Sequence, residues 1–248
     1  MLLEGKNAVI YGGGGSIGGA VAKAFAREGA LVYLAGRTKA TLDAVADEIR
    51  GAGGQAQTAE VDALDEASVD AHADAIPGGI DISFNVIGLN DVQGTPLAEM
   101  ALADFMAPID TALRSQFLTA RAAARHMIPR GSGVILWFGG EGDPIRDYSI
   151  GGVQIAFHAV EAMRRQLGTE LGKHGVRTVT LRSGGIPESI PESLAARDRI
   201  AEMLEGATLL GRTATFEDVG NVAAFVASEK ARTMTAATVN VSAGALLD

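Results

Sequence analysis

The stretch Asn7-Ala8-Val9-Ile10-Tyr11-Gly12-Gly13-Gly14-Gly15-Ser16-Ile17-Gly18 joins an apolar segment to a run of glycines, and helix-forming residues follow it. Because glycine has no side chain, the backbone N–H groups of such a loop can approach an anion closely. The following helix adds unpaired N–H groups and the positive end of its dipole. The stretch therefore predicts a strand, a turn and a helix that together bind the diphosphate of a nucleotide.

Short β-branched segments alternate with longer segments of helical periodicity along the whole chain. This alternation is typical of βαβ units, in which helices cover both faces of a parallel sheet. Right-handed crossovers then produce an α/β fold with a doubly wound, Rossmann-type sheet and a crevice at the carboxyl ends of its strands. We expect seven strands, at residues 8–11, 31–35, 55–61, 82–87, 134–138, 178–181 and 237–241. We expect helices at residues 16–28, 39–50, 66–75, 102–127, 153–173 and 216–228.

Length and composition indicate one domain over residues 1–248, since 47% of the residues are hydrophobic and α/β folds of this length often form a single core. A net charge of −9 disfavours nucleic acid as a partner, because Lys and Arg dominate binding to phosphates. The absence of cysteine excludes disulfides and thiolate chemistry. Residues 1–6 resemble neither a signal peptide nor a membrane anchor, so we expect a cytoplasmic protein with no membrane partner.

The most irregular segment is 183–211, where Gly, Pro, Ser and Glu cluster around a short helix expected at 194–204. Such a segment can be a substrate flap over a ligand or an ordinary surface connection. The sequence leaves both interpretations open.

Several motifs at the expected strand ends resemble the short-chain dehydrogenase/reductase family, and the resemblance covers nearly the whole chain. In the family's Thr-Gly-x-x-x-Gly-x-Gly motif, Tyr11 takes the place of the threonine and Ser16 that of the second glycine. Ser16 would then adopt glycine-like backbone angles at a modest strain cost. The resemblance implies an oxidoreductase that binds NAD or NADP through Gly12, Gly15, Ser16, Ile17 and Gly18.

The end of the second expected strand reads Ala35-Gly36-Arg37-Thr38, without the acidic residue that NAD-preferring members of the family carry. Arg37 offers a bidentate guanidinium for a 2′-phosphate, which favours NADP(H) over NAD. The alternative is an exposed arginine at the start of a helix. Asp62 follows the third strand, where the resemblance implies contact with the adenine amine, although Asp62 can also cap the next helix.

The resemblance implies that two further segments contact the cofactor. The fourth strand ends in Asn85-Val86-Ile87-Gly88, and Asn85 and Gly88 match the family's Asn-Asn-Ala-Gly. Ser183-Gly184-Gly185-Ile186 falls where the family has Pro-Gly before its substrate loop, which places Ile186 near the nicotinamide carboxamide.

The catalytic residues of the family are absent from this chain. The family uses a Tyr whose pKa is lowered by a Lys one helical turn later, assisted by a Ser and an Asn. None of the three tyrosines here has Lys four residues later. Matching segments on either side place Val153 at the Tyr position, Phe157 at the Lys position, Gly139 at the Ser position and Ala112 at the Asn position. The chain therefore resembles a divergent family member, with an apolar surface where an ammonium normally holds the hydroxyls of the nicotinamide ribose.

Other side chains offer only weak substitutes for this proton relay. Tyr148 precedes Val153 in a loop with Glu141, Asp143, Arg146 and Asp147, where an arginine could activate the phenol. The alternative is an exposed polar loop. The four histidines show no metal-ligand spacing, so we expect no metal site.

Three hypotheses about function follow from these observations. The first is an oxidoreductase that binds NADP(H) and has an atypical active site, acting on a small carbonyl compound or an activated alkene. The second is a catalytically silent homologue, either a binding or regulatory protein or the inactive partner of an active paralogue. The third is a non-redox cyclase or isomerase on the same fold. The resemblance also implies a homodimer or homotetramer.

Overall fold

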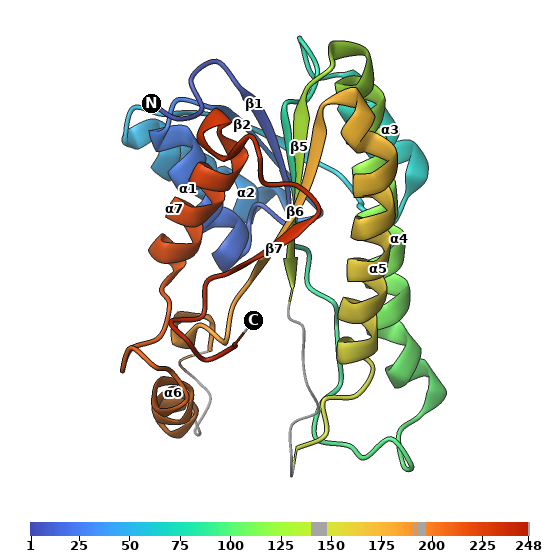
Figure 1. The fold of residues 1–248 in the computed structure, drawn as a ribbon, viewed down its shortest axis with the longest axis vertical. Coiled ribbons are helices and arrows are strands. Elements are labelled where there is room, and N and C mark those ends of the chain that lie inside the picture. Colours follow the sequence, from blue (N-terminus) through green and yellow to red (C-terminus); the bar gives the residue numbers. More distant parts are fainter. Residues whose placement is uncertain (140–147, 191, 193–196, 248) are drawn as a thin grey trace.

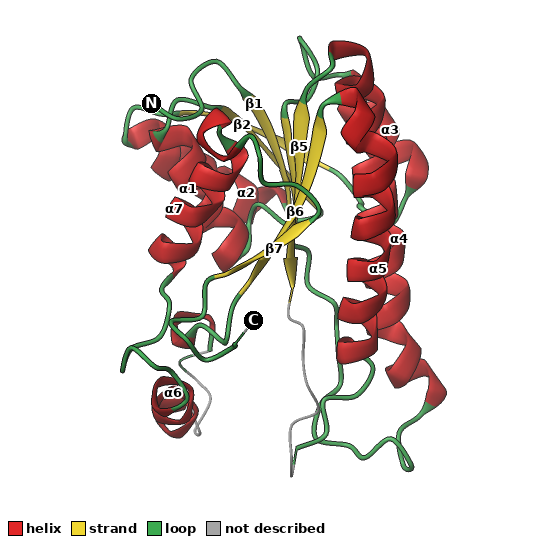
Figure 2. Cartoon of the chain, in the orientation of Figure 1, coloured by secondary structure: helices red, strands yellow, loops and turns green. Residues whose placement is uncertain are grey.

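Seven parallel strands form one sheet in the order β3-β2-β1-β4-β5-β6-β7 (Figures 1 and 2). The computed structural model describes residues 1–139, 148–190, 192 and 197–247. The strands are β1 (Asn7–Tyr11), β2 (Leu31–Gly36), β3 (Gln55–Glu60), β4 (Ile82–Asn85), β5 (Gly133–Gly139), β6 (Val176–Arg182) and β7 (Ala237–Asn240). The predicted Rossmann-type sheet is confirmed.

Helices cover both faces of this sheet (Figure 1). One face carries α1 (Ser16–Arg27), α2 (Lys39–Gly51) and α7 (Phe216–Ala227). The other carries α3 (Glu66–Asp74), α4 (Leu102–Met127) and α5 (Val153–Leu171), while α6 (Arg197–Gly206) lies apart, beyond the carboxyl edge of the sheet. Four short 3-10 turns complete the elements, at Ile128–Arg130, Gly172–His174, Pro187–Ser189 and Glu229–Ala231.

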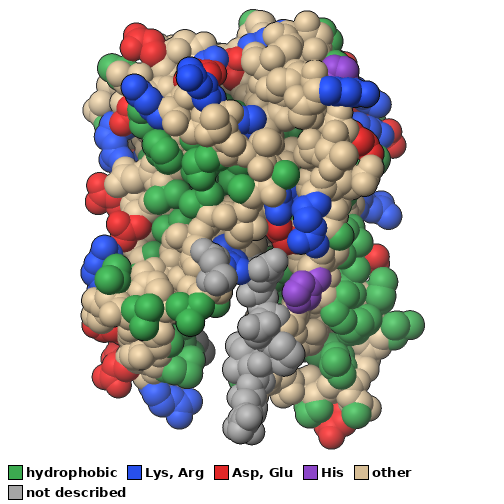
Figure 3. All heavy atoms as spheres, viewed as in Figure 1, with side chains coloured by type: hydrophobic (Ala, Val, Ile, Leu, Met, Phe, Trp, Pro, Cys, Tyr) green, Lys and Arg blue, Asp and Glu red, His purple; other side chains and the backbone are tan. Residues whose placement is uncertain are grey.

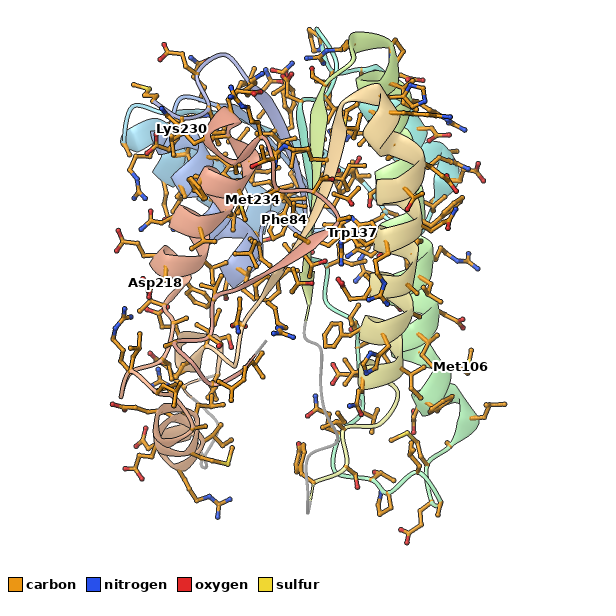
Figure 4. The ribbon with its side chains drawn as sticks, viewed as in Figure 1. Phe84, Met106, Trp137, Asp218, Lys230 and Met234 are labelled. Atoms are coloured by element: carbon orange, nitrogen blue, oxygen red, sulfur yellow. The ribbon has the colours of Figure 1, made fainter. Side chains whose placement is uncertain are left out.

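Alternation along the central strands divides the core into two apolar layers. Phe84 of β4 is fully buried in the layer under α1, α2 and α7. Trp137 of β5 is fully buried in the layer under α3, α4 and α5. Figure 4 shows both side chains at the centre of the molecule. The sheet is therefore a rigid support, and the residues available for chemistry lie at its carboxyl edge.

Strand register brings the motif residues together at that edge. Tyr11 pairs with Asn85, and Gly139 pairs with Arg182. The fourth strand was expected to reach residue 87 but ends at Asn85, because the Asn85 Oδ1 accepts a hydrogen bond from the Ile87 backbone N–H (3.2 Å). This local bond turns the chain away from the sheet ladder.

The segment 183–211 holds a 3-10 turn and α6, and α6 buries none of its residues. The expected helix at 194–204 is found as Arg197–Gly206, and residues 193–196 lie outside the described part of the chain. Gly185 lies against Leu204, since a Cβ atom there would be 2.8 Å from the Leu204 Cδ2. A flap role for this segment stays a prediction.

Candidate functional site

A pocket of about 300 Å³ opens at the carboxyl ends of β1, β2 and β4. Five of the residues predicted to bind a cofactor line it: Gly12, Gly15, Arg37, Asp62 and Gly88. Sequence reasoning missed other lining residues, among them Tyr11, Thr38, Thr41, Asn90 and Thr111. Tyr11 ends β1 and Thr38 follows β2, so their place at a strand end was an available signal, whereas Thr41 of α2 and Thr111 of α4 had none.

The glycine loop forms the floor of this pocket because it packs too closely to carry side chains. A Cβ atom on Gly18 would lie 2.2 Å from the Gly12 carbonyl oxygen, and one on Gly12 would lie 2.8 Å from the Val86 carbonyl oxygen. Gly12 also has a φ of +84°, which favours glycine. The strain expected at Ser16 is absent, since Ser16 is the first residue of α1 and has no positive φ.

The N-terminus of α1 points its free donors at the same place. Its N-cap is Gly15, and no side chain caps this end of the helix. The first-turn N–H groups and the positive end of the helix dipole are therefore available to an anion. A cradle of backbone donors without side chains fits the diphosphate of a dinucleotide.

Arg37 stands at the mouth of the pocket, directly after β2. Its side chain is exposed and has no hydrogen bond or ion pair with any residue that the structure describes. The neighbouring Lys39 is instead paired with Asp43, at 3.0 Å between the Nζ and Oδ2 atoms. Arg37 is thus an unengaged guanidinium at the mouth of the pocket.

Asp62 does not cap the next helix. Asp65 is the N-cap of α3, and its Oδ1 accepts from the Ala67 backbone N–H (3.2 Å). The Asp62 Oδ1 accepts from the Leu64 backbone N–H (3.0 Å), which holds the carboxylate beside the pocket that it lines. The cap interpretation was wrong for Asp62.

Other predicted cofactor residues do not reach the pocket lining. Asn85 is buried: its Nδ2 donates to the Thr119 Oγ1 (3.0 Å), and its backbone oxygen accepts from the Gln116 Nε2 (3.2 Å). Asn85 therefore ties β4 to α4. Ile186 is buried among core side chains. Ser16, Ile17 and Gly18 shape the turn but do not line the pocket.

The four positions assigned to the catalytic side chains are all apolar, and each is partly or fully buried. A Cβ atom on Gly139 would lie 3.3 Å from the Phe157 Cδ1, so the phenyl ring covers the glycine. Val153 is the buried first residue of α5, and Ala112 is buried in α4. None of these four residues has a side chain that can donate or accept a proton.

Two tyrosines remain near this edge of the sheet. Tyr148 is 50% exposed, and its hydroxyl donates to the Gln93 Oε1 (3.2 Å). Arg146, which was considered as its activator, and Glu141, Asp143 and Asp147 lie outside the described residues. Burial and, to a smaller extent, the Asp70 carboxylate raise the pKa of Tyr11, so this phenol holds its proton more tightly than an exposed tyrosine.

A buried polar cluster under α5 was also missed. Glu161 and Arg164 form an ion pair, with 2.7 Å between the Glu161 Oε2 and the Arg164 Nη2. Thr180 and Thr238 donate to the same carboxylate. A glutamate and an arginine three residues apart on an apolar helix face were the signal that could have revealed this pair.

Beyond the carboxyl edge of the sheet, hydrophobic side chains gather on the face drawn in Figure 3, over α6 on one side and over the first turns of α4 and α5 on the other. Exposed apolar residues come from α6 and the turn after it on one side, and from α4 and α5 on the other. They are Met203, Leu209, Leu210, Leu102 and Ile155. Within the described ranges, no three His, Asp or Glu side chains could hold a metal ion, and no helix has the length and apolar character needed to cross a membrane.

Comparisons with known proteins agree with this geometry. Residues 13–245 match the sequence model of the family described as "Enoyl-(Acyl carrier protein) reductase". The chain is 31% identical to gluconate 5-dehydrogenase of Gluconobacter oxydans, with 91% of this chain and 89% of that protein covered. It is 31% identical to galactitol 2-dehydrogenase of Rhizobium johnstonii, with 98% and 95% covered.

A solved structure gives the same result. A short-chain type dehydrogenase/reductase from Mycobacterium marinum superposes with a TM-score of 0.88 at 28% identity, and 99% of this chain and 97% of that chain are covered. The sheet, the glycine cradle and these relatives agree: this chain belongs to the short-chain dehydrogenase/reductase family.

Proposed function

We propose that the protein is an oxidoreductase that binds NADP(H) and works with an atypical active site. The observation that carries this proposal is the pocket itself, in which a side-chain-free cradle meets the uncapped N-terminus of α1 and the unengaged Arg37. The backbone of residues 12–18 would hold the diphosphate. Arg37 would hold the 2′-phosphate, and Asp62 would accept a hydrogen bond from the adenine amine.

The substrate proposed is a small carbonyl compound or an activated alkene. NADPH supplies a hydride when it is bound. Two relatives are named for dehydrogenation of sugar derivatives, and the matching family description names an enoyl reductase, so both substrate types have support. The apolar surface of Val153 and Phe157 offers no proton, and Tyr148 or water would have to supply it. The exposed hydrophobic side chains of α6, α4 and α5 beyond the sheet edge suit a substrate with apolar parts.

Cofactor titration tests this proposal. Isothermal titration of the purified protein should show that NADPH binds more tightly than NADH. The Arg37→Met variant should lose about 10- to 100-fold of its NADPH affinity, the usual worth of a charge-assisted phosphate contact, and should keep its affinity for NADH. Lys39→Met is the matched control, because Lys39 lies two residues away and is already paired with Asp43. Absence of NADPH binding at high micromolar concentration would reject the proposal.

A catalytically silent homologue is the second candidate, and one specific observation favours it. The Phe157 ring packs against Gly139, so the region that should transfer protons is filled by an apolar contact. Such a protein would bind NADP(H) or another ligand and regulate a partner, or assemble with an active paralogue. A panel of carbonyl compounds and enones, followed by the absorbance of reduced nicotinamide, separates the two candidates. Product formation without a change in that absorbance would instead indicate a cyclase or isomerase.

A further inference from the structure

A second pocket opens at the amino edge of the sheet, at the opposite end of the strands from α6 (Figure 1). The first residues of β4, β5 and β6 line it, together with the turns before β5 and β6 and the chain after α7. Its volume is about 310 Å³, which is similar to that of the pocket at the carboxyl edge and lies within the usual range for small-molecule sites. The two pockets share no residue, so the amino-edge pocket is a separate place for a small ligand.

Five ionisable side chains line this amino-edge pocket, namely Lys6, Asp81, Arg177, Glu229 and Arg232. Three of them have partners within the chain. Asp81 forms an ion pair with Arg130. Arg177 donates to three backbone oxygens at and after the end of α7, at 2.9 to 3.1 Å. Burial lowers the pKa of Arg177, and the carboxylate of Glu229 offsets part of this effect, so these two charges balance one another.

The other two cations have no partner in the part of the chain that the structure describes. Neither Lys6 nor Arg232 makes a side-chain hydrogen bond or an ion pair there. Lys6 is partly buried directly before β1, and Arg232 is exposed directly after the turn Glu229–Ala231. The chain has a net charge of −9, so two unbalanced positive charges in one pocket make a local site of positive potential.

A third pocket, between α1, α2 and α7, shows the contrast. Two cations also line it, but both are engaged. Lys23 forms an ion pair with Glu48, and the Arg27 Nη2 donates to the Asn221 Oδ1 (2.6 Å). An anion would have to break these interactions, whereas Lys6 and Arg232 can accept one without losing a partner.

We propose that the amino-edge pocket binds a small molecule that carries a phosphate monoester. Such a group has a charge of about −1.5 to −2 at neutral pH, which matches Lys6 and Arg232 together, whereas a carboxylate would leave one of them unbalanced. The Arg232 guanidinium can donate two parallel hydrogen bonds to phosphate oxygens, and the Lys6 ammonium acts as a point charge. The hydroxyls of Ser132 and Thr235 line the same pocket and can bond to the rest of the ligand. This site is independent of the proposed function.

Titration calorimetry with glycerol 3-phosphate tests the proposal, at constant ionic strength because salt screens exposed charges. Lys6→Met and Arg232→Met should each bind this probe about 10-fold or more weakly than the unaltered protein. Lys230→Met is the matched control and should bind the probe normally. Lys230 (Figure 4) is an exposed lysine two residues before Arg232 and does not line the pocket. Lys6→Gln and Arg232→Gln repeat the comparison if circular dichroism shows that a Met variant is unfolded.

A second comparison separates this pocket from the glycine loop, where a phosphate can also bind. Gly18→Ala should open that loop, because its Cβ would lie 2.2 Å from the Gly12 carbonyl oxygen. This variant should bind 2′,5′-ADP, which carries the phosphates of the adenosine half of NADPH, more weakly and should keep its affinity for glycerol 3-phosphate.

Three outcomes would overturn the inference. The first is equal affinity for glycerol 3-phosphate in Lys230→Met, Lys6→Met and Arg232→Met. The second is a loss of affinity in Gly18→Ala alone, which would place the phosphate in the glycine loop. The third is that neither glycerol 3-phosphate nor inorganic phosphate binds at low millimolar concentration. Failure of the unaltered protein to bind 2′,5′-ADP would instead count against the proposed function alone.

Discussion

The contact between Gly139 and Phe157 predicts a measurable coupling between the two positions. A Cβ atom on Gly139 would lie 3.3 Å from the Phe157 Cδ1 and 3.7 Å from its Cε1. Carbon atoms attract best at about 3.5–4.0 Å, so the nearer contact is too short and the ring must shift by a few tenths of an ångström. Gly139→Ser should therefore destabilise the protein by about 1–2 kcal/mol, within the range of overpacked cores.

Gly139→Ser and Phe157→Ala together form a double-mutant cycle, in which the second change removes the phenyl ring. A fully buried Phe→Ala change costs about 3–5 kcal/mol, and the partly exposed Phe157 should cost about 2 kcal/mol. In the double variant the serine at position 139 has no phenyl ring to clash with, so the destabilisation caused by Gly139→Ser should disappear. The free energies of unfolding should then deviate from additivity by about 1–2 kcal/mol, in favour of the double variant.

Urea denaturation followed by tryptophan fluorescence is the assay, because the chain has one tryptophan, Trp137, two residues before Gly139. The denaturant slopes of the four proteins must agree for the free energies to be compared. Gly88→Ser is the matched control, since a Cβ atom there would have no neighbour within 4 Å, and it should not couple to Phe157→Ala. The reasoning is refuted if the double variant loses the sum of the two single losses in free energy of unfolding, to within about 0.3 kcal/mol. The Phe157 ring would then not be the reason that position 139 is a glycine.

Three further predictions address the cradle, the ion pair and pH. Gly18→Ala should open the loop, since its Cβ would lie 2.2 Å from the Gly12 oxygen, and titration should show at least about 10-fold weaker binding of 2′,5′-ADP. Glu161→Gln should cost about 3 kcal/mol in urea denaturation because it leaves Arg164 buried without its partner, whereas a Leu/Met replacement of the pair should cost far less. Burial lowers the pKa of His72, so the unfolded chain takes up the proton first, and stability should fall as the pH drops below about 6.5. Denaturation midpoints between pH 7 and pH 5 should depend less on pH in His72→Gln, and an unchanged slope would contradict this assignment.

The pocket at the carboxyl edge could be predicted because the residues that form it are set by local sequence. The glycine run, Arg37 and Asp62 each lie within two residues after a strand, and parallel strands bring their carboxyl ends to one edge. Predicted strand and helix ends differ from the structure where a side chain forms a hydrogen bond with a nearby backbone N–H group. Asn85 ends β4 early by accepting from Ile87, and Asp65 rather than Asp62 caps α3.

The cluster under α5 was not predictable for a different reason. Arg182 meets Gly139 only through the register of β6 with β5, and it meets Phe157 only through the packing of α5 on the sheet. Neither is encoded in a local pattern, because an arginine after an apolar strand is equally typical of an exposed strand end. Hydrophobic periodicity locates a helix but does not report which charged residue lies beneath it.

The apolar surface on α5 and the cation on β6 are best understood together. A lysine at position 157 would bring a second positive charge to the cavity that Arg182 already lines, and like charges in a water-poor space repel strongly. An aromatic ring avoids this repulsion, and it lines the same small cavity as Glu161. Phe157→Lys should therefore cost less stability when Arg182 is also replaced by Met, and urea denaturation of the single and double variants measures this difference. Equal costs of Phe157→Lys in the two backgrounds would contradict the repulsion between the two positions.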